Sequence, residues 1–384
     1  MSITPTPHDD AAGLVPETAG TSLLEPREVF DQQLFEREMV RVHGRSWILL
    51  GDTEDLEQPG DYITARIGLQ KVIVIVGRDG SLRGFLNSCR HRASSLCDDP
   101  AGNTGRFLTC PYHQWSYRLN GELAVVPDQD RMYGPDFDRA DYSLVPIRIE
   151  VGWGKLVFGC LSARTPSLRD WVADLGPRYD RMGIESTRRH PRELDQVYTM
   201  NWKVFLENAN DDYHVRFVHP RPGSQIDPLG TRNLAEGWVC SSYKPYDRDL
   251  DPGPDFPHAP SFDGTGFFAH FIFPSVNQLV PVPGQLVTVR NEPLTPTSTR
   301  LVTRVYTSDG DEVAAEELLD EIDRTNTEDT DMIAVLMEGL RSPFLHVGPA
   351  ASWERRSAHV MDMVRAETAR EIAPGEFTHS GAAR

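Results

Sequence analysis

Long apolar runs are missing from this sequence of 384 residues. A helix that crosses a membrane needs about 20 consecutive apolar residues, and no run of even about 18 occurs, so we expect no transmembrane helix. The first residues also lack the basic start and the apolar segment of a secretory signal. We therefore expect a cytoplasmic protein that does not bind membranes.

Positive charge is also scarce. Lys and Arg together number 39 against 57 for Asp and Glu, which gives a formal net charge of -18. An acidic surface repels nucleic acids and anionic lipids, so neither is expected as a partner. At roughly 150 residues per domain, the length predicts about two globular domains.

Cysteine is too sparse for a disulfide framework. The chain has five, an odd number, and two of them lie close to histidines. In a cytoplasmic protein, clustered cysteine and histidine are more often metal ligands than disulfide partners. The other three, Cys97, Cys160 and Cys240, are interpreted as ordinary buried residues.

Hydrophobic periodicity predicts a chain that mixes helices and strands. Residues 27–44 have the spacing of an amphipathic helix that ends at Gly44, and short β-rich runs separated by turns follow from Trp47 to about Cys160. The clearest later elements are a strand passing into a helix at 195–208, strands at 266–273 and 299–307, and a charged helix at 311–341.

Two short motifs each offer one thiolate and one imidazole. Cys89 and His91 form a Cys-x-His motif, and Cys110 and His113 form a Cys-x2-His motif 18 residues later. Two Cys and two His can hold zinc, or a [2Fe–2S] cluster in which two His replace two Cys on one iron. Zinc fingers usually have two cysteines in one loop and two histidines in the other. Each loop here supplies one cysteine and one histidine, so the pattern favours a cluster of two irons. Trp115 and Tyr117 are placed to shield such a cluster.

A second group of potential ligands follows at residues 207–219. His214 and His219 are five residues apart, about 140° out of phase on a regular helix, so the helix must distort or end before His219. Asp211 lies one turn before His214 on the same face. Two His and a carboxylate on one face of Fe(II) leave positions for O2 and substrate. Taken alone, the segment is equally well interpreted as an acidic helix start with two incidental histidines.

Together these motifs resemble a known family. The sequence CRHR…CPYHQWSYRLNGEL closely resembles the Rieske domain of bacterial Rieske non-heme iron oxygenases, and NWKVFLEN…D-x-x-H-x4-H resembles their mononuclear-iron signature. The chain is identified as similar to the catalytic α (large) subunit of the aromatic-ring-hydroxylating members, over about residues 27–360.

The resemblance implies an α+β fold, with an N-terminal all-β Rieske domain followed by a helix-grip (START-like) catalytic domain of antiparallel sheet and helices. The expected divisions are a flexible tail (1–22), an N-terminal helix packing on the catalytic domain (23–45), the Rieske domain (46–160), the catalytic domain (161–374) and a second tail (375–384).

The resemblance also assigns ligands. Cys89 and Cys110 would bind one iron of the cluster and His91 and His113 the other, while His214 and His219 would bind a mononuclear Fe(II).

The third ligand of that iron is an aspartate far downstream in the family. Asp329 has the best register, with Asp331 and Glu328 as alternatives. Asp211 matches a bridging carboxylate that links an iron histidine to a cluster histidine of the next subunit, and Asn208 lies near the same site.

The implied reaction begins with NAD(P)H electrons, which a separate ferredoxin or reductase passes singly to the cluster and then through Asp211 to Fe(II), where O2 is activated. No GxGxxG fingerprint follows a strand, so a reductase partner is required, and the bridging carboxylate implies a homotrimer.

The substrate is expected to be a small organic molecule. ENANDDYH favours an aromatic compound, including carboxylated rings. The stretch FIFPSVNQLV…NEPLTPTSTRL instead resembles monooxygenases or N-demethylases of betaine-like or carnitine-like quaternary ammonium compounds. Such a cation needs an aromatic cage, for which Phe267, Phe268, Phe271 and Phe273 are candidates, although alternate strand residues usually face opposite sides. An electron carrier without catalysis and a zinc-stabilised binding module are the non-catalytic alternatives.

Overall fold

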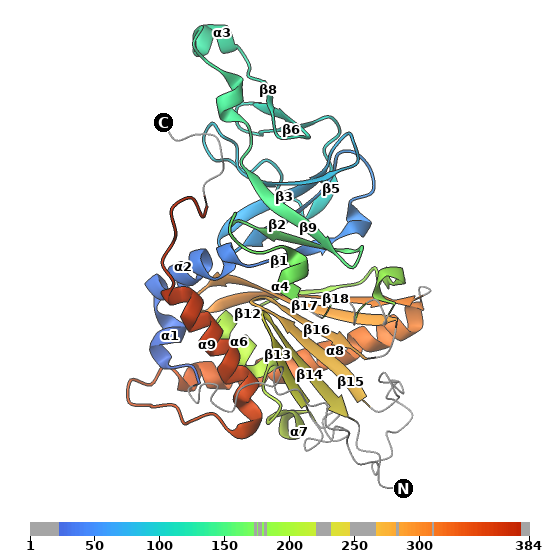
Figure 1. Cartoon of the computed structure of the whole chain (residues 1–384), viewed down its shortest axis with the longest axis vertical. Coiled ribbons are helices and arrows are strands. Elements are labelled where there is room, and N and C mark those ends of the chain that lie inside the picture. Colours follow the sequence, from blue (N-terminus) through green and yellow to red (C-terminus); the bar gives the residue numbers. More distant parts are fainter. Residues whose placement is uncertain are drawn as a thin grey trace. The chain divides into compact units, whose positions relative to one another are not determined.

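The computed structural model describes most of the chain (Figure 1). The described residues are 23–172, 175, 179, 183–219, 232–245, 266–281, 284–308 and 311–377. They form two compact units: a smaller one of Gln33–Asp170 with Glu367–Arg384, and a larger one of Met1–Gln32 with Trp171–Ala366. No helix among the described residues is long and apolar enough to cross a membrane.

The smaller unit is built of antiparallel strands, as the turn-rich sequence predicts. Seven strands form one sheet in the order β1-β10-β9-β4-β3-β2-β5, and β6-β7-β8 form a second. Their bounds are β1 Ile48–Asp52, β2 Asp61–Ile67, β3 Gln70–Val76, β4 Leu82–Leu86, β5 Ala101–Asn103, β6 Phe107–Thr109, β7 Ser116–Arg118, β8 Leu123–Val125, β9 Pro146–Gly152 and β10 Leu156–Cys160. Short helices are α3 Gln129–Met132 and α4 Leu168–Val172, the latter at the boundary between the units.

Strand β3 explains how this unit positions its cysteines. Its apolar run is buried on both faces, so alternate side chains enter two separate cores. Val72, Val74 and Val76 pack in one core. Ile73 and Ile75 pack in the other, together with Cys89, Cys110, Trp115 and Tyr117. The two cysteine loops are therefore fixed on the hydrophobic core of the domain.

The predicted helix at 27–44 is divided in two. Helix α1 covers Pro26–Phe30 and α2 covers Gln32–Arg41, with the intervening Asp31 in an extended conformation at φ -74° and ψ 112°. The carbonyl of Val29, which a continuous helix would use internally, accepts a hydrogen bond of 2.8 Å from Asn201 Nδ2. This contact is with a residue distant in sequence, so local periodicity did not predict the break.

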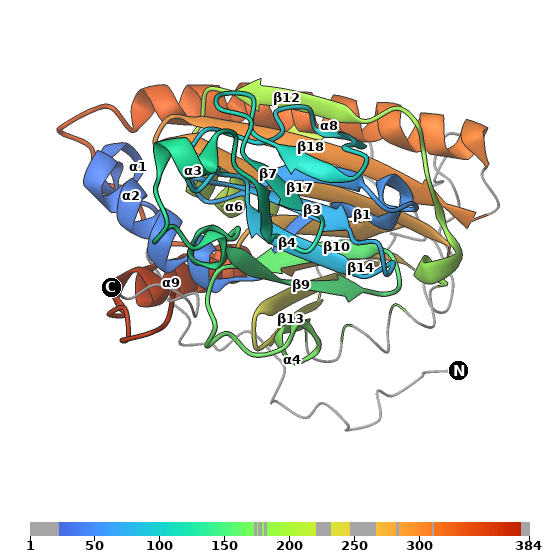
Figure 2. The ribbon, with the colours of Figure 1, turned by 90° about the horizontal axis from the view of Figure 1, so that it is seen from above.

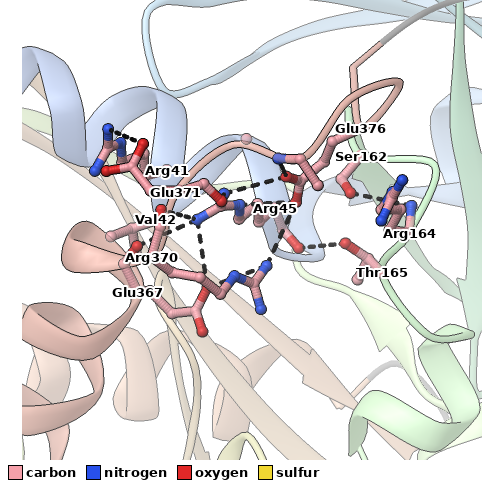
Figure 3. Close-up of polar contacts among 12 residues, drawn as sticks. Arg41, Val42, Arg45, Ser162, Arg164, Thr165, Glu367, Arg370, Glu371 and Glu376 are labelled. Carbon is pink, nitrogen blue, oxygen red and sulfur yellow. Dashed lines mark hydrogen bonds and ion pairs between the residues drawn. The ribbon is translucent and has the colours of Figure 1, made fainter.

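Within the smaller unit, Arg45 binds residues 370–376 near the C-terminus (Figure 3). It belongs to the 3-10 turn His43–Arg45 and is 2% exposed. Its guanidinium donates to both carboxylate oxygens of Glu376, at 2.8 and 3.1 Å, and to the carbonyls of Arg370 and Glu371, at 2.9 and 2.6 Å (Figure 3). Residues 375–377, where the sequence predicts the start of a tail, are thus placed, and Glu376 is buried.

The larger unit contains one extended antiparallel sheet of eight strands. Its order is β11-β18-β17-β16-β15-β14-β13, and β12 also pairs with β18. The bounds are β11 Arg188–Arg189, β12 Leu194–Tyr198, β13 Arg232–Glu236, β14 Val239–Pro245, β15 Gly266–Ile272, β16 Val276–Val280, β17 Gln285–Thr295 and β18 Ser298–Thr307. The principal helices are α6 Trp202–Ala209, α7 Val215–Val218, α8 Glu312–Gly339 and α9 Arg355–Ala369.

Helix α8 runs along the β12 and β18 side of this sheet and also contacts α6 (Figure 2). Its buried side chains recur every three or four residues, as an amphipathic helix on a sheet requires. They are Ala315, Leu318, Leu319, Ile322, Ile333 and Met337. Asp329 falls on this inward stripe, and Asn326 Nδ2 donates 3.4 Å to Thr303 Oγ1 of β18. The helix therefore brings Asp329 towards α6 and α7.

Candidate metal centres

The two Cys/His loops of the smaller unit have the same backbone geometry. In each, the N–H of the residue four positions after the cysteine donates to the cysteine carbonyl, from Ala93 to Cys89 at 2.8 Å and from Gln114 to Cys110 at 3.1 Å. Ala93 and Gln114 both have left-handed backbones, with φ of 57° and 61°. These tight turns bend each loop so that its cysteine and its histidine can both bind one metal cluster.

The four side chains are arranged as two like pairs. The thiols of Cys89 and Cys110 are buried and close enough to interact, and burial raises the pKa of Cys89. The imidazoles of His91 and His113 lie nearer the surface, with ring centres 4.6 Å apart. His91 Nδ1 is buried without a hydrogen-bond partner. Two thiolates inside and two imidazoles outside match the two irons of a [2Fe–2S] cluster.

A single zinc fits this arrangement poorly. Tetrahedral zinc needs four ligand atoms within about 2.3 Å of one point. Among the described residues, the one set of three or more potential ligand atoms lying within 4.8 Å of one another is His214, His219 and Asp329. No three of the four Cys and His side chains in the loops converge in this way, which favours two metal atoms over one.

Two aromatic residues complete the first site. Tyr117 is fully buried, and its hydroxyl accepts a 3.0 Å hydrogen bond from the N–H of Arg90 while lying 3.3 Å from Cys89 Sγ. Because the oxygen is accepting from Arg90, its proton is free to point at the sulfur and stabilise negative charge there. Trp115 stacks on His91, with ring centres 5.0 Å apart.

His214, His219 and Asp329 converge in the larger unit. Nε2 of His214 lies 3.3 Å and Nε2 of His219 lies 3.1 Å from Oδ1 of Asp329. Helix α7 ends at Val218, and His219 has left the helical conformation, with φ -104° and ψ 93°. The predicted end of the helix before His219 is therefore confirmed, and this end is what allows both rings to face one aspartate.

A carboxylate holds the far side of each ring. Nδ1 of His214 lies 2.9 Å from Asp211 Oδ2, and Nδ1 of His219 lies 2.7 Å from Glu328 Oε2. An N–H at Nδ1 that donates to a carboxylate leaves the Nε2 lone pair directed at the shared centre, as metal-binding histidines require. Glu328, an alternative third ligand in the sequence, thus lies behind His219, and Asp331 is exposed.

The electrostatics of this centre favour a bound cation. Burial alone would lower the pKa of His214, but its hydrogen bonds with Asp211 and Asp329 raise it to about 9. Burial alone would raise the pKa of Asp329, but hydrogen bonds with the two histidines hold it well below its usual range. Without a metal, protons occupy the positive position that Fe(II) would take.

Asn208 and Arg356 support the same centre. Asn208 Nδ2 donates a hydrogen bond of 3.2 Å to Asp329 Oδ1, so its amide lies beside the group formed by the two histidines and Asp329. Arg356 of α9 is buried and donates to the carbonyl of Asn210 and to Asp212, both at 3.2 Å. Arg356 was missed in the sequence because an arginine so distant from the histidines carries no local signal.

Comparison with known families covers both centres. Residues 46–144 match the family described as Rieske [2Fe-2S] domain, and residues 168–369 match the family described as ring hydroxylating alpha subunit (catalytic domain).

Curated relatives belong to two kinds of oxygenase system. The chain is 36% identical over 194 residues to the large oxygenase component of a naphthalene 1,2-dioxygenase system from Pseudomonas aeruginosa, covering 49% of this chain and 42% of that protein. It is 34% identical over 190 residues to a glycine betaine monooxygenase oxygenase subunit from Pseudomonas aeruginosa (strain UCBPP-PA14), covering 50% and 43%. Each match thus spans less than half of the relative's length.

Solved structures of the same two kinds share the fold. The quaternary ammonium Rieske monooxygenase CntA with L-carnitine superposes with a TM-score of 0.78 at 22% identity, covering 95% of this chain and 100% of that one. Naphthalene 1,2-dioxygenase with indole gives 0.76 at 22% identity, covering 96% of each. The predicted α+β fold, a Rieske domain followed by a catalytic domain, is confirmed. This chain belongs to the Rieske non-heme iron oxygenases as a ring-hydroxylating-type α subunit, a family whose cofactors are a [2Fe–2S] cluster and a mononuclear iron.

Proposed function

We propose that this chain is the oxygenase component of a multi-component system that hydroxylates a small aromatic compound with O2. The observation that carries the proposal is the meeting of His214, His219 and Asp329 within one chain that also holds a Rieske domain. A cluster alone carries electrons, whereas a 2-His-1-carboxylate iron, when bound, supplies O2 activation. The electron-carrier alternative leaves this second centre unexplained.

The ligand roles follow the geometry. Cys89 and Cys110 would hold the inner iron of the cluster, and His91 and His113 the outer one. His214, His219 and Asp329 would hold the mononuclear iron. Their support is the pairing of like side chains in the first centre and the convergence of one oxygen and two nitrogens in the second.

The residues around the second centre would orient its ligands. Asp211 and Glu328 fix the two imidazole rings, and Asn208 fixes the carboxylate of Asp329. We propose that Asp211 also meets a cluster histidine of a neighbouring subunit in a homotrimer and carries electrons between them. The exposed ring of His113 is suited to such a contact. Electrons would come from a ferredoxin or an NAD(P)H-dependent reductase.

The sheet face beside the iron supports an aromatic substrate. Asn233 Nδ2 donates 3.1 Å to Asp212, and Thr303 accepts from α8, so these two residues mark the face of the sheet towards the iron. Strand register places apolar residues between them on the same face. They include Ala269, Phe271, Leu279, Val289 and Leu301.

This face suits a betaine-like ligand less well. None of the described side chains that the register places on it between Asn233 and Thr303 is charged, whereas a zwitterion needs partners for both of its charges. Phe268 stacks with His270 on the opposite face, where His270 meets Tyr179. Phe268 and Phe271 of β15 therefore do not line one cage, because their odd spacing along the strand puts them on opposite faces of the sheet.

Product analysis with a surrogate ferredoxin and reductase tests the proposal. The panel contains naphthalene, indole, benzoate and salicylate, and also glycine betaine and carnitine. We expect an aromatic product that carries 18O from 18O2. The shared fold with CntA supports a quaternary ammonium substrate as the second candidate. Release of formaldehyde from glycine betaine, with no labelled aromatic product, would favour that candidate.

A further inference from the structure

Two asparagines on the iron-side face of the sheet have buried side-chain atoms without hydrogen-bond partners. Asn291 of β17 is 2% exposed, and neither its Nδ2 nor its Oδ1 has a partner. Asn277 of β16 has a buried Nδ2 that is also unpaired. Buried amides are nearly always paired, because an unpaired one loses its bonds to water without replacement. These two side chains therefore need an explanation.

Asn201 shows how a structural buried asparagine of the same unit is paired. Asn201 is fully buried, and its Nδ2 donates to the carbonyls of Val29 and Pro296 at 2.8 and 2.7 Å, while its Oδ1 accepts from the N–H of Lys203 at 2.9 Å. Asn201 thus joins three segments of the larger unit. Asn277 and Asn291 join nothing, although they lie in central strands.

Burial along β16 differs between the two faces of the strand. Val276, Gln278 and Val280, which face away from the iron, are all buried. Asn277 and Leu279, which face the iron side, are only partly buried. Strand β16 is thus packed on one face and partly accessible on the other, so the face that carries Asn277 is open to contact with a ligand.

Strand register brings the two amides together. Asn277 lies opposite Val289 of β17, and Asn291 is two residues further along that strand, so both side chains point to the same face. Diagonal neighbours of this kind are about 7–8 Å apart, so a single oxygen-bearing group placed between them reaches both. Ser242 of β14 adds an unpaired buried hydroxyl on the same face.

We propose that Asn277 and Asn291 form an amide subsite that hydrogen-bonds an oxygen-bearing substituent of the substrate. The preferred substrate class is then an aromatic acid or phenol, not an unsubstituted hydrocarbon or a cation. This inference rests on the proposed function, since it assumes a substrate beside the iron. Neutral donors on rigid strands fix a ligand's orientation at the cost of some stability in the free protein.

Thermal unfolding of the ligand-free holoenzyme tests whether the amide of Asn291 binds a ligand or stabilises the fold. Leucine has a similar volume and no polar atoms, so Asn291→Leu is expected to raise Tm by about 2–4 °C. The matched variant Asn201→Leu is expected to lower Tm, because it leaves two carbonyls and an N–H unpaired. A fall in Tm for Asn291→Leu like that of Asn201→Leu would make Asn291 structural and overturn the proposal.

Calorimetric titration of the anaerobic holoenzyme tests the ligand class with salicylate and naphthalene as probes. Asn277→Leu and Asn291→Leu are each expected to weaken salicylate binding about tenfold, and to change naphthalene binding by less than about twofold. Unchanged salicylate affinity in both variants, or a wild type that binds no salicylate, would overturn this inference. Neither result touches the proposed function, which fails separately if no ring compound is oxidised.

Discussion

Glu328 holds the imidazole of His219 from behind, and this single contact gives the first prediction. Removing a carboxylate that orients a metal-binding histidine typically costs 10–100-fold in metal affinity. We expect Glu328→Ala to weaken Co(II) binding at the second centre by about that factor, and Glu328→Gln to weaken it less because the amide oxygen still accepts. Visible absorption of bound Co(II) during titration measures it.

The control for this prediction is Asp331→Ala. Asp331 is exposed on the same helix and carries the same charge, so its removal tests the general electrostatic effect. Equal affinities for Glu328→Ala and Asp331→Ala would show that Glu328 does not position His219.

Glu207 predicts a pH dependence of stability. Burial raises the pKa of this carboxyl from 4.5 to about 8, although the N–H of Leu24 donates to it at 2.7 Å. The folded state therefore binds one more proton than the unfolded state between these values, so stability falls as pH rises through this window and levels off above pH 8. The full loss is up to about 5 kcal/mol.

The variant Glu207→Gln removes that titration. Chemical unfolding at pH 5, 7 and 9 should show a flatter dependence than in the wild type, while Glu317→Gln, an exposed substitution on α8, should keep the wild-type slope. A wild-type slope in Glu207→Gln would contradict the assignment.

At the scale of elements, helix α8 was the easiest to predict. Its apolar stripe repeats over many turns, so a helix expected at 311–341 is found at Glu312–Gly339. The same periodicity separates Asp329 from its acidic neighbours, since consecutive residues of a helix lie about 100° apart. Periodicity could not predict the hydrogen bond between Glu328 and His219, because this contact depends on where α7 ends in the folded structure.

Elements fixed by distant contacts escaped prediction. The break between α1 and α2 accompanies a hydrogen bond from Asn201, and the position of residues 370–376 depends on Arg45. Asn201 and Arg45 are both far in sequence from the segments they contact, so a pattern of neighbouring residues cannot reveal these contacts. The cluster motif, by contrast, was evident because all four of its side chains lie in two short loops.

The contact of Arg45 with Glu376 gives a prediction at this scale. Both side chains are buried, so Arg45→Met leaves the Glu376 carboxylate with only the half-exposed guanidinium of Arg370, 3.4 Å away, as a cationic partner. The loss is expected to cost up to about 3 kcal/mol of the free energy of unfolding. Adding Glu376→Met should recover much of that loss, because the buried carboxylate that Arg45 neutralised is then gone as well. Urea unfolding measures both. A double variant no more stable than Arg45→Met would show that the guanidinium acts mainly on the carbonyls of Arg370 and Glu371.

At the scale of the whole molecule, the proposed homotrimer can be tested by complementation. Cys110→Ala should disable the cluster of its own subunit, and Asp211→Ala should block the transfer of electrons to the iron of its own subunit. If electrons cross between subunits, mixed trimers contain intact pairs, and mixing after dissociation should restore part of the activity that neither variant has alone. No recovery in verified mixed trimers would place the transfer within one chain.

The central claim is that the cluster and the His214, His219 and Asp329 centre act together in one oxygenase. A single-turnover experiment tests it most directly: protein with a chemically reduced cluster receives O2 and an aromatic substrate without any reductase. We predict labelled product and reoxidation of the cluster in the wild type, and in His214→Ala a normal Rieske EPR signal but no product. Product formation by His214→Ala, or a colourless zinc-containing wild type, would contradict the account.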